Sequence, residues 1–422
     1  MDNVTCPFCG LACDDLRVDV CAGTPIPRAN ACSISRDAYQ HLAPVPNASP
    51  RVGGAAVSLD AAVAHAARTL AEAKNPVFGG FATDLSGARR MVQLADRCGA
   101  VIDHMNSTAK LRNLLTVQDA GWIAATLAEV KNRADVVVLL GTDAVSRFPR
   151  FFERVVWNPE SMFDLDPQSR EIVFVGKGLD TRAGYAADGR APTSIGCRID
   201  EIGEGLGAMS SLLAGLVPQA QTIAGVPLSQ WAALLEKLCK AKYAVIVWAA
   251  PDLDFPHAEL TVQTLSALIK DLNRTTRVCG MPLGGSDGDF TANGVLTWQT
   301  GLPLRSSFAT GISVYEPHLN STQRLLDSGE ADALVWVTSF NPRRLPPPTH
   351  LPTIVLAPPS ARFEREPEVF IPVGTPGVDH AGHYMRTDKV VTLPLRKLRD
   401  IGLPAVEAVV AAIEASLPVG VV

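Results

Sequence analysis

The 422-residue sequence has few charged residues and no excess of either sign. Charged residues make up 19% of it, and 38 Lys and Arg stand against 43 Asp and Glu, for a net charge of -5. Without a basic block, the chain lacks an electrostatic footprint for nucleic acid. Its apolar runs fall far short of the ~20 residues that cross a bilayer, and its first residues lack the basic and apolar regions of a signal peptide. We therefore expect a globular protein of the cytoplasm that binds neither nucleic acid nor membrane.

Cysteines are few, odd in number and unevenly placed. Five of the nine fall within the first 32 residues: Cys6, Cys9, Cys13, Cys21 and Cys32. This distribution favours a metal site in a reducing compartment over a disulfide framework. The other four stand singly in apolar surroundings, and we expect them to be core residues. They are Cys98, Cys197, Cys239 and Cys279.

The N-terminal cysteines have the spacing of a metal-binding loop. Cys6, Cys9 and Cys13 form a CxxCxxxC pattern, and Cys32 follows at a distance. Such a loop lets three thiolates converge on one centre while the fourth ligand comes from elsewhere in the chain. The ligand types fit a four-iron four-sulfur cluster or a zinc ion, and a site that is now empty is the third alternative. Cys21 is a second candidate for the fourth ligand.

The pattern after residue 50 is typical of an α/β protein. Ala43–Pro50 holds three prolines and is predicted to be a linker, which closes an N-terminal Cys-rich module at residues 1–50. From 51 to 422, apolar runs of strand length alternate with amphipathic stretches, and Val136–Leu140 is the clearest buried strand. This alternation predicts parallel sheets in two or three Rossmann-like subdomains with interleaved segments. A helix is predicted over Thr116–Glu129.

In a parallel sheet, ligands bind outside the carboxyl ends of the strands. The loops that follow the predicted strands are therefore the places to look for chemistry. They are Gly79–Thr83, Asp103–Lys110, Gly141–Arg150, Gly176–Arg182, Gly280–Asn293 and Thr338–Arg344.

Three further motifs favour ordinary structural roles. Gly284–Gly288 satisfies GxSxG, but the sequence after it does not read as the helix that follows a nucleophilic serine, so a glycine-rich turn is the preferred interpretation. His380 and His383 lie among turn residues, and the arginine pair Arg343–Arg344 is more typical of a salt-bridged loop than of a phosphate site. No HExxH or HxH pattern is present, so the sequence shows no zinc hydrolase ligand set of its own.

Several segments resemble the B subunit of formylmethanofuran dehydrogenase. The resemblance spans nearly the whole chain and is carried by Cys6–Asp15, Asn30–Arg36, Leu127–Val137, Leu296–Gly301 and Ile371–Asp379. It implies a fold similar to the molybdopterin oxidoreductases, with a small Cys-rich module followed by parallel-sheet α/β domains. Residue by residue, Cys6, Cys9, Cys13 and Cys32 match the cluster ligands of that family.

One departure from the family affects the expected function. Members that reduce carbon dioxide carry a Cys or selenocysteine that ligates tungsten or molybdenum, in a loop that here reads Asp103–Arg112 and contains no cysteine. A metal site without its soft thiolate ligand loses its anchor and its electronic tuning. We therefore expect no pterin metal in this chain and no redox chemistry.

This combination resembles the B subunit of the bacterial formyltransferase/hydrolase complex of methylotrophs. The resemblance implies a non-catalytic or catalytically reduced structural subunit. The complex would convert formyl-tetrahydromethanopterin to formate, through a methanofuran-type carrier on partner subunits, in one-carbon (formaldehyde) oxidation. The implied partners are a formyltransferase subunit, a dinuclear-zinc hydrolase subunit and a further structural subunit. The alternatives are an active dehydrogenase subunit with a tungsten or molybdenum pterin and an iron-sulfur cluster, or an electron-transfer module that keeps only the cluster.

Overall fold

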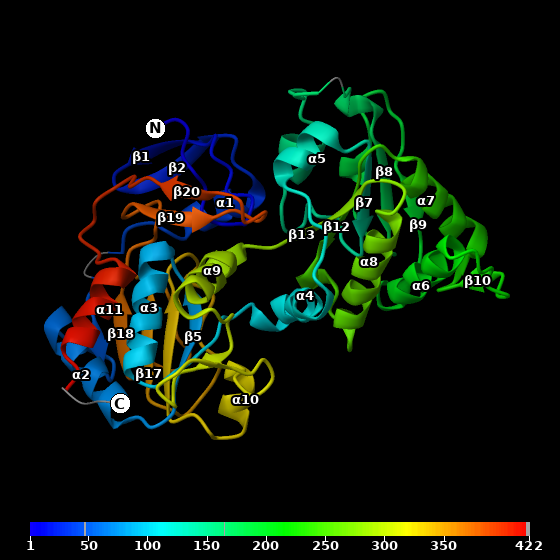
Figure 1. Ribbon diagram of the computed structural model, residues 1–422. Helices are drawn as coiled ribbons and strands as arrows, with labels where there is room; N and C mark the ends of the chain where they lie inside the picture. Colours follow the sequence, from blue (N-terminus) through cyan, green and yellow to red (C-terminus); the bar gives the residue numbers. More distant parts are fainter. Residues whose placement is uncertain (46–47, 164, 419–422) are drawn as a thin grey trace. The chain divides into compact units, whose positions relative to one another are not determined.

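The computed structural model describes residues 1–45, 48–163 and 165–418. Contacts divide the chain into two compact units. The first joins Met1–Ser107 to Gly285–Val422, and the second, Thr108–Gly284, is inserted between those two segments (Figure 1). The linker predicted over Ala43–Pro50 includes residues 46 and 47, which lie outside the described part of the chain.

The first unit is built on a nine-stranded sheet in the order β15-β14-β6-β5-β16-β17-β18-β3-β4. Its centre, from β6 to β18, is parallel, and antiparallel strands lie at both edges. The central strands are apolar and buried because helices or loops cover both faces. Their bounds are β5 (Pro76–Ala82), β6 (Val101–Ile102), β16 (Ala333–Thr338), β17 (Thr353–Ala357) and β18 (Val369–Pro372). The edge strands are β3 (Arg51–Val52), β4 (Ala55–Ala56), β14 (Ser306–Ser307) and β15 (Val314–Tyr315).

One large apolar cluster joins the helices of this unit to its sheet. The apolar faces of α2 (Leu59–Glu72), α3 (Leu85–Arg97), α9 (Asp289–Thr300) and α11 (Val406–Ala415) contribute to it. Local capping fixes where two of these helices begin, since the Ser58 hydroxyl accepts from Ala61 N and the Asp84 carboxylate accepts from Gly87 N. The opposite face of the sheet carries a smaller cluster that includes Leu325 of α10 (Thr322–Asp327).

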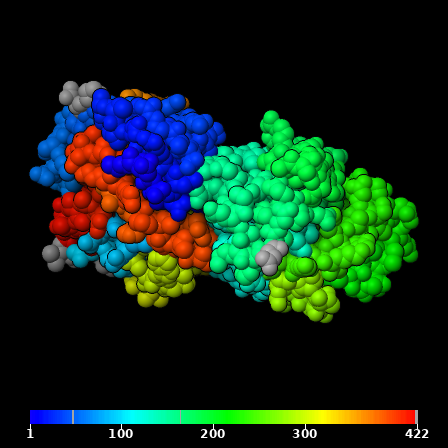
Figure 2. All heavy atoms as spheres, turned by 90° about the horizontal axis from the view of Figure 1, so that it is seen from above, coloured from blue at the N-terminus to red at the C-terminus, as the bar shows by residue number. Residues whose placement is uncertain are grey.

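The N-terminal segment forms a small layer of its own within the first unit. It contains β1 (Arg17–Cys21), β2 (Thr24–Ala29) and α1 (Ser33–Gln40), and lies beside the hairpin of β19 (Gly382–Met385) and β20 (Thr392–Leu395) (Figures 1 and 2). Thr387 N donates to Gly10 O at 2.7 Å, and Arg399 Nη1 donates to Gly23 O at 2.6 Å. Residues near the C-terminus thus hold the Cys-rich segment in place.

The second unit is a five-stranded parallel sheet in the order β13-β12-β7-β8-β9. Its strands are β7 (Val136–Leu140), β8 (Glu171–Val175), β9 (Thr193–Ile195), β12 (Ala244–Ala249) and β13 (Val278–Leu283). Trp231 and Trp248 fill its apolar core. The helices are α4 (Ser107–Ala120), α5 (Leu127–Arg133), α6 (Ile202–Leu213), α7 (Leu228–Lys240) and α8 (Ala258–Leu272), and β10 (Thr222–Ile223) pairs with β11 (Val226–Pro227).

The predicted fold class is confirmed: the protein is α/β with parallel sheets after a small Cys-rich N-terminus. One helix prediction was wrong. The helix expected over Thr116–Glu129 is two helices, because α4 ends at Ala120 and Gly121 follows with a φ of +64°, a conformation that stops a helix. The capping box of Thr126 and Glu129 then starts α5. Because α4 begins at Ser107, the loop expected over Asp103–Lys110 is limited to residues 103–106.

Candidate functional site

The CxxCxxxC segment folds back on itself within a few residues. Cys6 N donates to Cys13 O at 2.8 Å, and Ala12 N donates to Cys9 O at 3.1 Å. Ala12 takes a left-handed φ of +46°, which completes the reversal. The side chains of Cys6, Cys9 and Cys13 are all buried. The local fold therefore buries all three cysteines within one short loop.

Cys32 reaches this region from the first turn of a helix. It is the N-cap of α1, and its thiol lies 3.6 Å from Ser35 Oγ. Cys21, by contrast, is exposed in β1. Of the four scattered cysteines, Cys98, Cys197 and Cys279 are buried as expected, but Cys239 is exposed on α7, so that core prediction was wrong.

The thiols of the loop influence one another. Burial raises the pKa of Cys6 well above its usual range, and negative charge on Cys9, Cys13 and Cys32 raises it further. Burial also raises the pKa of Cys9 to about 12, with Cys13 and Cys32 adding to the effect. Backbone N–H groups of Phe8, Leu11 and Ala12 act in the opposite direction. Metal-free, Cys6 and Cys9 are therefore neutral thiols at neutral pH.

The donor set agrees with a thiolate-bound metal in chemistry, although no cage is preformed. Within residues 1–45, 48–163 and 165–418, no group of three or more His, Cys, Asp or Glu side chains is arranged to hold a metal ion as it stands. Three buried thiols and a fourth at a helix N-terminus are nevertheless the ligand types of iron-sulfur and zinc sites. The N–H groups turned toward Cys6 and Cys9 would stabilise bound thiolates.

Next to this loop, the structure brings together several of the loops that follow strands. His104 Nε2 lies 3.2 Å from the Asp287 carbonyl oxygen, and Asn106 Nδ2 donates to Ser286 O at 3.1 Å. Arg344 Nη2 donates to Asn106 Oδ1 at 2.6 Å, while its Nε lies 3.4 Å from Asp287 Oδ2. The loops after β6 and β16, which follow parallel strands of the first unit's sheet, therefore meet the turn of residues 285–288.

The Gly284–Gly288 segment is a tight glycine-rich turn, as predicted, but a helix follows it directly. α9 begins at Asp289, so the expectation of no adjacent helix was wrong. Gly285 has a φ of +91°, and a Cβ there would lie 2.9 Å from Gly10 Cα. A Cβ at Gly288 would lie 2.8 Å from Thr83 O. Both glycines are thus required by close backbone approach.

Tyr384 fixes the inner side of this turn. Its buried hydroxyl donates to Gly285 O and accepts from Gly288 N at 3.2 Å. Burial raises the pKa of Tyr384 well above its usual range, and negative charge on Asp289 and Cys9 adds to this. The Cys loop and the turn thus lie within electrostatic reach of each other. Nothing in the local sequence around Tyr384 indicated this role.

A cavity of about 220 Å³ opens between the Cys-rich segment and the convergent loops. Aromatic Phe8 and Phe340 form part of its wall, and Asp37, Asp287 and Arg343 supply charge. Arg343 also forms an ion pair with Asp37. The sequence had singled out Arg343 but not Asp287, which only the tertiary fold brings to the cavity.

Asp287 gives the site a testable pH dependence. Burial raises the pKa of its carboxyl, and Arg344 and Asn106 only partly oppose this. The folded protein therefore holds this proton more tightly than the unfolded chain does, so the contribution to the free energy of unfolding falls as the pH rises above about 4. We expect Asp287→Asn, which tolerates the local φ of +54°, to stabilise the protein at pH 8 but not at pH 4.

Urea unfolding at the two pH values measures this difference. Asp96→Asn, which changes an exposed side chain of the same unit, is the comparison for the general effect of removing a carboxylate. Equal effects of Asp287→Asn at pH 4 and pH 8 would contradict the assignment of a raised pKa to Asp287.

The remaining motifs have structural explanations. His380 lies in a turn, where Gly377 N donates to His380 O and His380 Nδ1 lies 2.8 Å from Ala381 O. Gly141–Arg150 and Gly176–Arg182 lie in the second unit. There, Arg147 pairs with Asp252, and Arg150 pairs with Glu153. The salt-bridged interpretation of Arg343–Arg344 is confirmed, because Arg343 pairs with Asp37 and Arg344 with Asp287.

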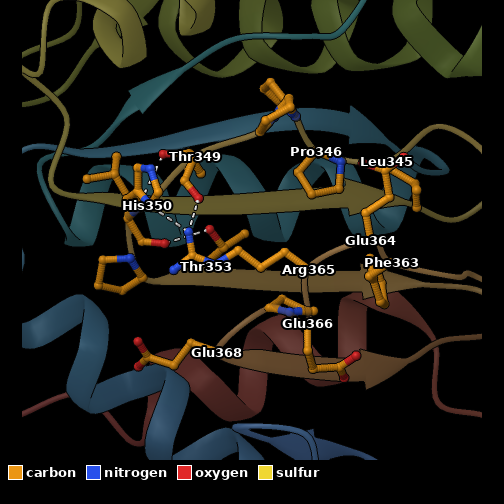
Figure 3. Close-up of a pocket in the computed structure, with 15 residues that line it drawn as sticks. Leu345, Pro346, Thr349, His350, Thr353, Phe363, Glu364, Arg365, Glu366 and Glu368 are labelled. Carbon is orange, nitrogen blue, oxygen red and sulfur yellow. Dashed lines mark hydrogen bonds between the residues drawn. The ribbon is translucent and has the colours of Figure 1, made fainter.

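A second cavity, of about 670 Å³, lies at the opposite edge of the first unit's sheet. Its walls are the segments 345–353 and 363–368, which precede β17 and β18, so it lies where these parallel strands begin. Arg365 turns toward Thr349 and His350 and donates to the Thr349 carbonyl (Figure 3). Glu366 pairs with Arg51, and Glu368 with His65. These pairings occupy charges that a ligand would need, so this cavity is the weaker candidate.

Of the helices among the described residues, none combines the length and apolar character needed to cross a membrane.

Comparisons with known proteins confirm the resemblance inferred from the sequence. No protein-family model matches the chain. It is 28% identical over 411 residues to the B subunit of the tungsten-containing formylmethanofuran dehydrogenase 2 of Methanocaldococcus jannaschii, covering 94% of this chain and 93% of that protein. The subunit of the same name in Methanococcus maripaludis is 26% identical with the same coverage. The B subunit of the formyltransferase/hydrolase complex Fhc from Methylorubrum extorquens is 27% identical over 336 residues, which is 78% of this chain and 86% of that one.

Comparison with solved structures supports the same fold. A chain in the crystal structure of the formyltransferase/hydrolase complex (FhcABCD) from Methylorubrum extorquens, in complex with methylofuran, superposes with a TM-score of 0.71. The sequences are 25% identical, and the match covers 87% of this chain and 98% of the other. The chain is thus similar over 94% of its length to the B subunits of two formylmethanofuran dehydrogenases, and over 78% of it to the B subunit of the Fhc complex.

Proposed function

We propose that this chain is a non-catalytic structural subunit of a formyltransferase/hydrolase complex. In this proposal the complex passes a formyl group from formyl-tetrahydromethanopterin to a methanofuran-type carrier and hydrolyses it to formate in the cytoplasm. Catalysis belongs to a formyltransferase subunit and a dinuclear-zinc hydrolase subunit, and a further structural subunit completes the assembly. The similarity to the B subunit of the Methylorubrum extorquens complex supports this assignment.

The composition and the hydrogen bonds of the Asp103–Asn106 loop carry the proposal. The family resemblance places the thiolate ligand of a catalytic metal here, but the loop has no cysteine. Instead, the side chains of His104 and Asn106 contact backbone oxygens of residues 286–287, and Arg344 donates a hydrogen bond to Asn106 Oδ1. Side chains engaged in these hydrogen bonds hold the loop against the turn. A pterin-bound metal has no soft thiolate ligand there.

The N-terminal cysteines have a separate, structural role in this proposal. Cys6, Cys9, Cys13 and Cys32 hold either a four-iron four-sulfur cluster or a zinc ion. Such a centre would bind the loop to the N-terminus of α1 and contribute to the folding of residues 1–45. The burial of three of the thiols supports this part of the proposal.

The second candidate function is an active dehydrogenase subunit. Its support is the alignment with the two tungsten-containing enzymes, which extends over 94% of this chain. The metal would then need a ligand other than cysteine at the loop, and His104, which lies within the loop, offers an imidazole nitrogen.

Metal and cofactor content of the anaerobically purified complex tests these alternatives. We expect about four iron atoms or one zinc ion per chain, without tungsten, molybdenum or extractable pterin. A stoichiometric pterin metal would refute the structural-subunit proposal in favour of the dehydrogenase. Iron without pterin that bleaches reversibly on reduction, in a preparation lacking formyltransferase and hydrolase subunits, would instead indicate an electron-transfer module.

A further inference from the structure

A buried tyrosine beside the Cys loop has no partner for its hydroxyl. Tyr39 is 1% exposed, and among the described residues no hydrogen-bond partner exists for its Oη. Leaving a buried hydroxyl unpaired costs free energy, and native proteins keep few such groups without a reason. Tyr243, in the second unit, shows the ordinary case, since its buried hydroxyl accepts from Cys279 Sγ at 3.3 Å.

The surroundings of Tyr39 connect it to the cysteines. Its ring packs edge-on against Phe8, inside the CxxC sequence, with 5.0 Å between ring centroids. It lies on α1 seven residues after Cys32, which is two helical turns along the same face. The charge of Cys6 also acts on its phenol and, after burial, is the second cause that raises the pKa of Tyr39. Because Phe8 lies between Cys6 and Cys9 in the sequence, this side chain packs beside the Cys loop.

We propose that Tyr39 is a positioning residue that donates its hydroxyl hydrogen bond to the Cys6 sulfur when the cysteine site holds its metal. A cysteine thiol is a weak acceptor, whereas a metal-bound sulfur has lost its proton and accepts well. The hydroxyl therefore lacks a good acceptor in the metal-free chain and gains one on metal binding. This inference rests on the metal proposed above at Cys6, Cys9, Cys13 and Cys32.

The pairing gives Tyr39 an effect that a purely structural residue does not have. Partners that hydrogen-bond to metal ligands commonly change metal affinity by tenfold or more when removed. In an iron-sulfur site they also raise the reduction potential, because they stabilise the more negative state. In the metal-free chain, the same hydroxyl contributes nothing favourable, so its removal leaves stability unchanged or improves it.

The test compares Tyr39→Phe with the wild-type full chain after anaerobic reconstitution with Fe²⁺ and sulfide or with Zn²⁺. We expect the variant to release metal to a chelator at least about tenfold faster, while its metal-free melting temperature stays the same or rises. Tyr243→Phe is the control, because its hydroxyl has a partner, Cys279, and lies in the second unit rather than beside the Cys loop. We expect it to change stability equally with and without metal, and to leave metal release unchanged.

Each alternative result has a separate meaning. Unchanged metal release from Tyr39→Phe would overturn the role of Tyr39 while leaving the metal site intact. A lowered melting temperature in the metal-free variant would make Tyr39 an ordinary packing residue and would also overturn it. If the wild-type chain takes up neither iron nor zinc, the metal proposal itself fails, and the inference about Tyr39 fails with it.

Discussion

Replacing Cys9 with serine is expected to abolish metal binding and to cause the largest loss of stability in the N-terminal segment. Cys9 is 5% exposed, and backbone N–H groups of Leu11 and Ala12 are turned toward its sulfur. Serine preserves the shape and can accept the same N–H groups, so metal-free stability should change by roughly 1 kcal/mol or less. Structural zinc contributes ~10–16 kcal/mol to small domains that depend on it, so the metal-loaded protein should lose several kcal/mol.

The measurement is the melting curve of the full chain, with metal content determined on the same samples. Cys21→Ser is the matched control, because Cys21 belongs to the same segment but is exposed in β1. We expect it to retain both metal and melting temperature. A melting curve of Cys9→Ser that matches wild type in a metal-containing preparation would refute the ligand role of Cys9. Metal loss in Cys21→Ser would identify Cys21 as a ligand.

Asp379→Ala is expected to destabilise the first unit by ~3–5 kcal/mol, because it leaves a buried guanidinium without its partner. Arg399 Nε lies 2.6 Å from Asp379 Oδ1, and the two side chains are 5% and 3% exposed, respectively. Asp379 Oδ2 also accepts from Thr375 N at 2.8 Å, and Arg399 Nη1 donates to Gly23 O. The pair therefore joins the Ile371–Asp379 segment to the loop between β1 and β2.

Urea unfolding of the full chain measures this effect, and two variants make it specific. The exposed pair of Asp19 and Arg28 is closer to the usual surface case, so Asp19→Ala should cost no more than about 1 kcal/mol. Combining Asp379→Ala with Arg399→Met removes the unpaired charge and should recover part of the loss. A double variant as unstable as the sum of the two single variants would contradict the proposed coupling.

The Ile371–Asp379 segment shows what a sequence resemblance contains and what it does not explain. The residues identified the family, but their spacing gave no reason for the pattern. In the structure, a Cβ at Gly374 would lie 2.9 Å from Asp379 Cβ, so glycine at this position makes room for the buried carboxylate. Asp379 in turn meets Arg399, twenty residues later. The reason for the pattern is tertiary.

Local features of the fold were predictable from the sequence because they depend on neighbouring residues. Val136–Leu140 is a strand with the expected bounds, since a continuous apolar run of this length favours a buried parallel strand. Helix ends were less predictable. Gly121 ended α4 where the apolar pattern alone predicted continuation.

The candidate site was predicted only in part. The sequence predicted that ligands bind at the loops that follow the strands. Three of these loops do meet around Asp287. Asp287 and Tyr39 were not singled out, because their roles come from burial and from the lack or presence of a partner. A single Asp or Tyr in a sequence carries no such signal.

By itself the sequence determined the α/β class, the cysteine spacing, the absence of a cysteine from residues 103–112 and the family resemblance. These are properties of residue type and short-range pattern, which local physical chemistry fixes. Only the tertiary structure decided that residues 108–284 form an inserted unit, that β5 pairs with β16 about 250 residues away, and that Tyr39 is buried beside the Cys loop. Long-range pairing and burial depend on how the whole chain packs, and no local pattern encodes them.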